Sequence, residues 1–180
     1  MRMDPGSLNG IRHDDWLEAQ CRRIETAGRA LSLTVGEINQ RTEQALSGGL
    51  GRRRRITEAQ LRQAEEAYRT LHDVQIDVQN ALFDCEHELR ELRERDVNPA
   101  ELLVDGERLI HQYRFLRRRA RLLDGLLAYL PGVCSHASTC VEHLQHMHDG
   151  VIVERLLTVP DWSFALVALE ALSEEEMRAH

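Results

Sequence analysis

The chain has 180 residues, of which 42% are hydrophobic and 29% are charged, a balance typical of a soluble globular protein. Its aromatic content of 4% is low for a β-sandwich, so we expect long helices packed through Leu and Ala. The net charge of −7 disfavours general binding to nucleic acid or to an anionic membrane. No apolar run approaches the roughly 18 residues that a membrane span requires, and no secretory signal opens the chain. We therefore expect a cytoplasmic protein, with the nucleus as the alternative.

Residues 1–13 contain proline and glycine and show no apolar periodicity, so we interpret them as a flexible N-terminal arm. A first helix is expected to begin at Asp14 or Asp15, because acidic side chains favour the positive end of the helix dipole. Its apolar positions recur in steps of three and four residues. These positions are Leu17, Cys21, Ile24, Gly28, Leu31, Val35, Ile38, Thr42 and Ala45. The glycine-rich residues 47–51 end this helix, and they lack the Gly-Lys-Ser/Thr of a phosphate loop.

The most regular pattern lies between Thr57 and Asp96, where the spacing predicts a helix approaching 60 Å in length at about 1.5 Å per residue. Thr57 and Gln60 have the spacing of a capping box at its start. The apolar line is Leu61, Ala64, Tyr68, Leu71, Gln75, Val78, Leu82, Cys85, Leu89 and Leu92. Small or branched residues widen this line on one side, which favours packing against two neighbouring helices.

A third helix is expected from Pro99, because Asn98 is a suitable cap and proline is favoured at the first helical position. The short connection predicts that the second and third helices run antiparallel. The periodicity of the third helix continues past Pro131 through Cys134, Ala137, Val141 and Leu144 to His148. We therefore favour one helix kinked at Pro131 over a break followed by a fourth helix.

The sequence thus predicts an all-α fold. Residues 14–149 form an elongated, coiled-coil-like, antiparallel three-helix bundle of up-down-up topology with a kinked third helix. Residues 150–180 form a connector and a shorter C-terminal amphipathic helix. If the helices fold back symmetrically about their connections, Gly28, Gln75 and Ala120 share one layer. A buried Gln in this layer would fix the helix register. The alternative is that a ligand or a partner side chain enters the space beside the small residues Gly28 and Ala120.

Cysteine and histidine gather in one stretch of the third helix. His136, Cys140 and His143 stand at i, i+4 and i+7 on one face, where nitrogen and sulfur ligands can converge on Zn²⁺. The spacing matches no standard zinc finger, so we favour surface histidines beside a core Cys134, with a zinc site as the alternative. The four cysteines are scattered and are expected to pack as free, apolar side chains.

All basic residues are arginine, and they gather in two places. Arg52, Arg53, Arg54 and Arg55 lie in a glycine loop, which we interpret as solvated, with a contact for an acidic surface or a localisation signal as the alternatives. The second group is a collar on the third helix, for which we favour pairing with acidic residues of the second helix over phosphate binding. The collar comprises Arg114, Arg117, Arg118, Arg119 and Arg121.

The C-terminal helix is a candidate binding surface because its large side chains cover more than one face. The candidates are Trp162, Phe164, Leu166, Leu169 and Leu172. Packing of this helix back onto the end of the bundle is the alternative interpretation.

No catalytic motif or nucleotide fingerprint is present, so we do not expect an enzyme. The favoured hypothesis is a non-enzymatic scaffold or adaptor, a rod-like subunit that binds a helical protein partner or a second copy. A metal-responsive regulator using residues 134–148 and an arginine-patch binder of phosphate or nucleic acid are the alternatives.

Overall fold

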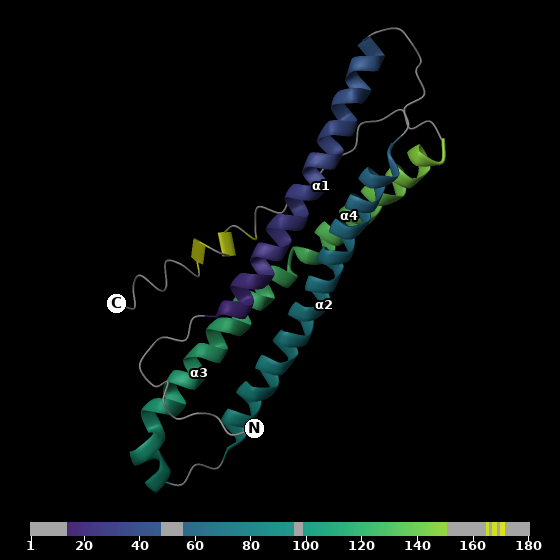
Figure 1. Ribbon diagram of the computed structural model, residues 1–180. Coiled ribbons are helices and arrows are strands. Elements are labelled where there is room, and N and C mark those ends of the chain that lie inside the picture. The colour runs from purple at the N-terminus through teal and green to yellow at the C-terminus, as the bar shows by residue number, and fades with distance from the viewer. Residues whose placement is uncertain are drawn as a thin grey trace.

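The computed structural model describes residues 14–47, 56–95 and 99–150, and five residues of the C-terminal segment (165, 167, 168, 170 and 171). Within these residues the chain forms α-helices and no strand, which confirms the all-α class. The helices are α1 (Asp15–Ser47), α2 (Glu58–Glu94), α3 (Pro99–Leu127) and α4 (Leu130–His148). Figure 1 shows that they lie along one another and give the molecule an elongated shape.

α2 is the central element of the fold. Its 37 residues give a length of about 55 Å at about 1.5 Å per residue, close to the expected value. It contacts α1, α3 and α4. Its flanking residues Ala67 and Val74 are buried together with the main apolar line, so the widened stripe does serve more than one neighbour.

A capping box begins α2, as the sequence predicts. The Gln60 backbone N–H donates to Thr57 Oγ1, and the Thr57 backbone N–H donates to Gln60 Oε1, each at 3.2 Å. Two N–H groups that the first turn would leave without partners are thereby satisfied.

Replacing Thr57 by alanine is expected to lower the free energy of unfolding by about 1 kcal/mol, the usual cost of losing an N-cap side chain. Thr57→Ser keeps the hydroxyl and is expected to keep most of this stability. Urea denaturation of both variants checks the prediction. Equal losses in the two variants would show that the hydroxyl does not stabilise the helix.

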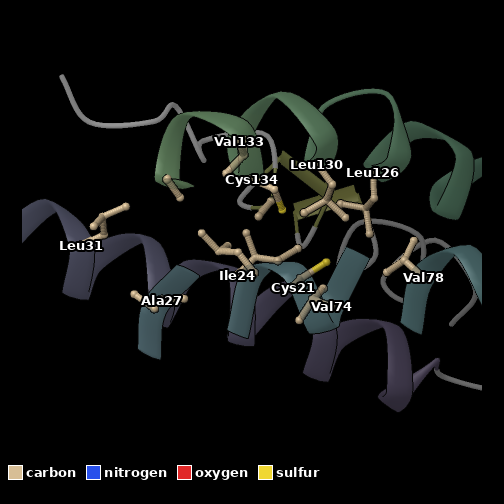
Figure 2. Packing of buried hydrophobic residues seen from close by; sticks show 14 of the residues in the cluster. Cys21, Ile24, Ala27, Leu31, Val74, Val78, Leu126, Leu130, Val133 and Cys134 are labelled. Carbon is tan, nitrogen blue, oxygen red and sulfur yellow. The ribbon is translucent and has the colours of Figure 1, made fainter. Parts of the chain in front are cut away.

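The apolar positions of α1 form one side of the core. Every described side chain of the expected series is buried, from Leu17 through Leu31 to Thr42. The three-and-four spacing places these residues on a single face, because an α-helix has 3.6 residues per turn. Figure 2 shows Cys21, Ile24, Ala27 and Leu31 along this face, opposite residues from α2 and from the bend between α3 and α4.

The third rod is bent, and the bend lies just before Pro131. α3 ends at Leu127, a two-residue turn follows, and α4 carries Pro131 in its first helical turn. Proline has no N–H to donate and its ring crowds the preceding turn, so the helical hydrogen-bond pattern is interrupted here. The Tyr129 N–H donates instead to Leu126 O at 3.1 Å. The apolar phase nevertheless survives, because Leu126 and Leu130 are both buried on the same side.

α4 ends at His148, two residues before a glycine in the left-handed conformation. Gly150 has a φ of +86°, a conformation that glycine adopts without a steric penalty. The Asp149 N–H donates to Gln145 O at 2.9 Å and the Gly150 N–H to Met147 O at 3.3 Å, so terminal carbonyl groups gain partners.

The expected layer of Gly28, Gln75 and Ala120 is wrong. Ala27 and Ala30 lie beside Ala67 and Thr70, so Gly28 is closer to that part of α2 than to Gln75. On the other side, Leu126 and Leu130 accompany Val74 and Val78 in Figure 2. Gln75 itself is only half-buried, so its amide does not need a partner within the core.

The register differs because the helices do not fold back symmetrically about the midpoints of their connections. Gln60, in the first turn of α2, bonds Glu37 at 3.2 Å, although α1 continues to Ser47. Figure 1 shows α1 extending past the beginning of α2 and α3 extending past its end. Packing of side chains, which connection length does not specify, sets these offsets.

Candidate interaction sites

Asp14 begins α1 and joins it to α3. The Leu17 N–H donates to Asp14 Oδ1 at 3.1 Å, the geometry of a helix N-cap. Asp14 Oδ2 lies 3.0 Å from Arg119 Nε, and the Asp14 side chain is 8% exposed. Neither of these two buried atoms has a hydrogen bond, so their contact is an ion pair without a well-directed N–H. The Arg119 guanidinium also lies 5.2 Å from the centre of the Trp16 ring.

A hollow of about 370 Å³ lies beside this ion pair. Three acidic residues of α2, Asp77, Asp84 and Glu88, line it together with Trp16 and Arg119. Asp77 is already paired with Arg23 of α1 at 2.9 Å. The negative charge of the residues that line the hollow is therefore partly neutralised. The hollow lies between α1, α2 and α3, near the first turn of α1.

A second hollow, of about 450 Å³, follows the groove between α1 and α2. Ala27, Ala30 and Ala67 line it together with polar side chains, which are Arg22, Arg23, Thr26, Gln63, Glu66 and Thr70. The small residues let the two helices approach closely, which is the structural reason for the groove.

Beyond Asp14 the described bundle contains only two helices. Trp16 lies beside Asp84 and Glu88 of α2, so α2 residues 89–94 and the N-terminal half of α3 extend past α1. We call residues 88–94 of α2 and 105–117 of α3 the two-helix end. Figure 1 shows α2 and α3 continuing beyond the first turn of α1.

The apolar residues of the two-helix end are incompletely covered. No side chain from 105 to 115 is buried, whereas Leu116 and Leu123 further along α3 are 4% and 0% exposed. Ile110 is 52% exposed, and Leu109 is half-buried. Arg93 bridges the two helices through a 3.2 Å hydrogen bond to Tyr113 Oη, which holds the pKa of this tyrosine below its usual range. Among the described residues, these apolar side chains of α2 and α3 therefore lie beyond the cover that α1 gives to the rest of the core.

The residues of the alternative zinc site, His136, Cys140 and His143, differ in their surroundings. His136 is exposed, His143 is half-buried, and Cys140 is directed into the core with 4% exposure. Among the residues that the structure describes, no group of three or more His, Cys, Asp or Glu side chains is placed to hold a metal ion. Cys140 packs in the hydrophobic core together with Cys134 and Ala137. It is therefore separated from the exposed His136, although the spacing places both on one side of the helix.

All four cysteines are free and buried, as expected. Burial raises the pKa of the Cys21 and Cys134 thiols to about 11, with Asp14 and Glu18 adding to the effect at Cys21. Burial also raises the pKa of Cys85 and Cys140. Protonated, buried thiols are poor nucleophiles and poor metal ligands, which indicates a packing role.

These thiols predict a loss of stability at alkaline pH. Unfolded thiols, with a pKa near 9.0, lose protons at a pH where folded Cys21 and Cys134 keep them. Their contribution is therefore complete below about pH 9 and falls as the pH rises towards 11. Urea titrations at pH 8 to 11 should show a shallower decline for the double variant Cys21→Ala/Cys134→Ala. Tyrosine ionisation is common to both proteins, and identical declines would contradict the prediction.

One member of the arginine collar, Arg119, pairs with α1 and not with α2 as expected. Arg119 reaches Asp14 of α1, and Asp77 of α2 is taken by Arg23. Arg114 and Arg117 are exposed, and no ion pair within the described residues engages them. Sequence reasoning missed the contact of Asp14, Trp16 and Arg119, since more than one hundred positions separate its ends and no local signal marks it.

Two sets of candidate residues lie outside the described residues. These are Arg52, Arg53, Arg54 and Arg55, and the C-terminal candidates Trp162, Phe164, Leu166, Leu169 and Leu172. Among their described neighbours, Ala165 is fully buried in the core and Val167 is 63% exposed. The C-terminal segment therefore contributes at least one side chain to the bundle.

No helix of the described part of the chain is long and apolar enough to cross a membrane. A scan against protein-family models, a search of curated proteins and a search of solved structures found no match to this chain.

Proposed function

We propose that this protein is a non-enzymatic interaction protein: an up-down-up, coiled-coil-like rod that serves as a scaffold or adaptor subunit by binding another protein. The observation that carries the proposal is the two-helix end, where the apolar seam of α2 and α3 continues without the cover of α1. A helix seam of this kind is suited to a further amphipathic helix, because each exposed apolar row fits between the rows of its neighbour.

The exposure of Ile110 supports this role. An isolated apolar side chain on a surface needs no explanation, but Ile110 adjoins half-buried Leu109 and Tyr113 on the same helix. Leu92 of α2 is also half-buried. Within the described residues these side chains are incompletely covered, so a binding partner at this end would bury them further. The C-terminal candidates around Trp162 remain a second predicted contact.

Affinity capture of the tagged full-length protein from its own cells tests the proposal. We expect a bound protein whose recovery falls at least tenfold when Ile110 is replaced by glutamate, because a charge there would have to be buried without a partner. Leu33→Glu is the matched control, since Leu33 is 66% exposed on α1. Recovery that is equal in both variants would exclude the two-helix end as the binding surface.

A further inference from the structure

The described part of the C-terminal segment has a buried face and an exposed face. All five described residues of this segment are helical. Ala165 is fully buried and belongs to the hydrophobic core, and Ala168 packs against that core. Val167 is 63% exposed, and Glu170 is exposed. Because residues three apart share a helix face and residues two apart do not, this alternation is that of an amphipathic helix packed through one face.

The sequence predicts a helix through this segment, and its spacing divides the C-terminal candidates between the two faces. Trp162 stands three residues before Ala165, and Leu169 and Leu172 stand four and seven residues after it. These positions share the face of Ala165. The positions on the opposite face are mostly polar: Ser163, Val167, Glu170 and Glu174. The face marked by the buried alanine is therefore also the apolar face of the sequence.

One side of α1 is buried although α2 does not cover it. Arg23 and Ala30 line the groove that α1 shares with α2. Cys21 and Gly28, which stand two residues before them, are buried. Two residues correspond to about 200° of rotation, so Cys21 and Gly28 lie on nearly the opposite side of the helix. Among the four helices, α1 packs closely only against α2, so the burial of this side indicates a further neighbour.

We propose that the C-terminal segment is a fourth helix of the bundle, docked through the face of Ala165 on the side of α1 that α2 leaves open. The described residues of the segment, in yellow, lie next to α1 in Figure 1 and behind Leu126 and Leu130 in Figure 2. Docking would withhold Leu169 and Leu172 from any outside protein. A partner could then bind this apolar face only after the segment leaves the bundle, whereas binding at the two-helix end would not require that step.

Hydrogen exchange of the full-length protein, followed by mass spectrometry, tests the docking. Backbone amides of residues 162–172 are expected to exchange at least a hundredfold more slowly than those of an unstructured chain, because a docked helix exchanges only when it opens. An isolated helix of this length is marginal in water, so its formation alone would not give such protection. Exchange of these amides at the rate of an unstructured chain would overturn the proposal.

A matched pair of variants tests the assigned face. Ala165→Glu would bury a charge without a partner and is expected to lower the protection of residues 162–172 at least tenfold, whereas Val167→Glu should leave it unchanged or greater. If Ala165→Glu also lowers the protection of α2, the milder pair Leu172→Ala and Val167→Ala decides, and only Leu172→Ala should weaken the segment. Equal effects within the deciding pair would overturn the proposal.

Photocrosslinking tests where the helix docks. A benzophenone amino acid at position 168 of the purified full-length chain is expected to crosslink to residues 21–35 of α1 or to residues 123–134 around the bend. The same group at position 167 should give no crosslink to these residues. Crosslinks from position 168 to a second copy, to the two-helix end or to nothing would overturn the proposal. Affinity capture with Ile110→Glu is independent of these results, so the proposed function can fail or hold separately.

Discussion

Replacing Leu31 by alanine is expected to lower the free energy of unfolding by about 2–5 kcal/mol, while the same change at Leu33 should stay within about 0.5 kcal/mol of the wild type. Leu31 is fully buried in the core and Leu33 is 66% exposed, although both lie on α1 two residues apart. Removal of buried methyl groups loses their transfer free energy and leaves a cavity, whereas truncation at the surface does neither. Guanidinium denaturation followed by circular dichroism measures both values.

The pair of variants is a test of helix phase. Leucine and alanine have similar helix propensities, so propensity contributes little to either value. A rotation of α1 by about half a turn would exchange the two positions and reverse the ranking. Equal losses in both variants, or a larger loss for Leu33→Ala, would therefore contradict the packing of α1 against α2. Unequal slopes of the transitions would indicate a change in the unfolded state instead.

Sequence periodicity predicted the faces of the helices because helix geometry is local. Leu17 and Leu31 of α1, and Leu71 and Val78 of α2, are fully buried, as the three-and-four spacing requires. The capping box at Thr57 likewise depends on residues within one turn, and the structure contains both of its hydrogen bonds. These features follow from contacts between residues that are near one another in the chain.

Longitudinal offsets between helices could not be predicted in the same way. The same heptad pattern allows one helix to slide past another by whole repeats at little change in its apolar content. The predicted layer of Gly28, Gln75 and Ala120 failed for this reason. The two-helix end is a consequence of the actual offset, so it too was absent from the sequence-based prediction.

The surroundings of the candidate zinc ligands also could not be predicted from their spacing. Cys140 was a candidate ligand of the alternative zinc site because its spacing with His136 and His143 places all three on one face of the helix. Spacing along a helix does not show which other elements each side chain contacts. In the structure Cys140 packs in the hydrophobic core and is 4% exposed. Asp14 was expected only to start a helix, whereas it also forms an ion pair with Arg119 of α3.

Replacing Asp14 by alanine is expected to destabilise the protein by about 2 kcal/mol. About 1 kcal/mol comes from the lost N-cap. The remainder comes from leaving the partly buried Arg119 guanidinium without its acidic partner. The Arg119 side chain retains 25% exposure, so solvent keeps the second part below the cost of breaking a fully buried pair. Asp14→Ser retains a capping oxygen without the charge and should lose about half as much. Urea denaturation separates the two contributions.

A double-mutant cycle of Asp14→Ser with Arg119→Met isolates the ion pair from the cap. Methionine keeps much of the aliphatic contact of arginine with Trp16 but removes the charge. We expect a coupling free energy of about 0.5–3 kcal/mol that decreases when salt is added. If Asp14 only caps α1, the two losses will be additive and Arg119→Met will not change the effect of Asp14→Ser. In that case the offset of α1 along α3 would depend on the apolar seam alone, and the length of the two-helix end would not depend on this pair of charges.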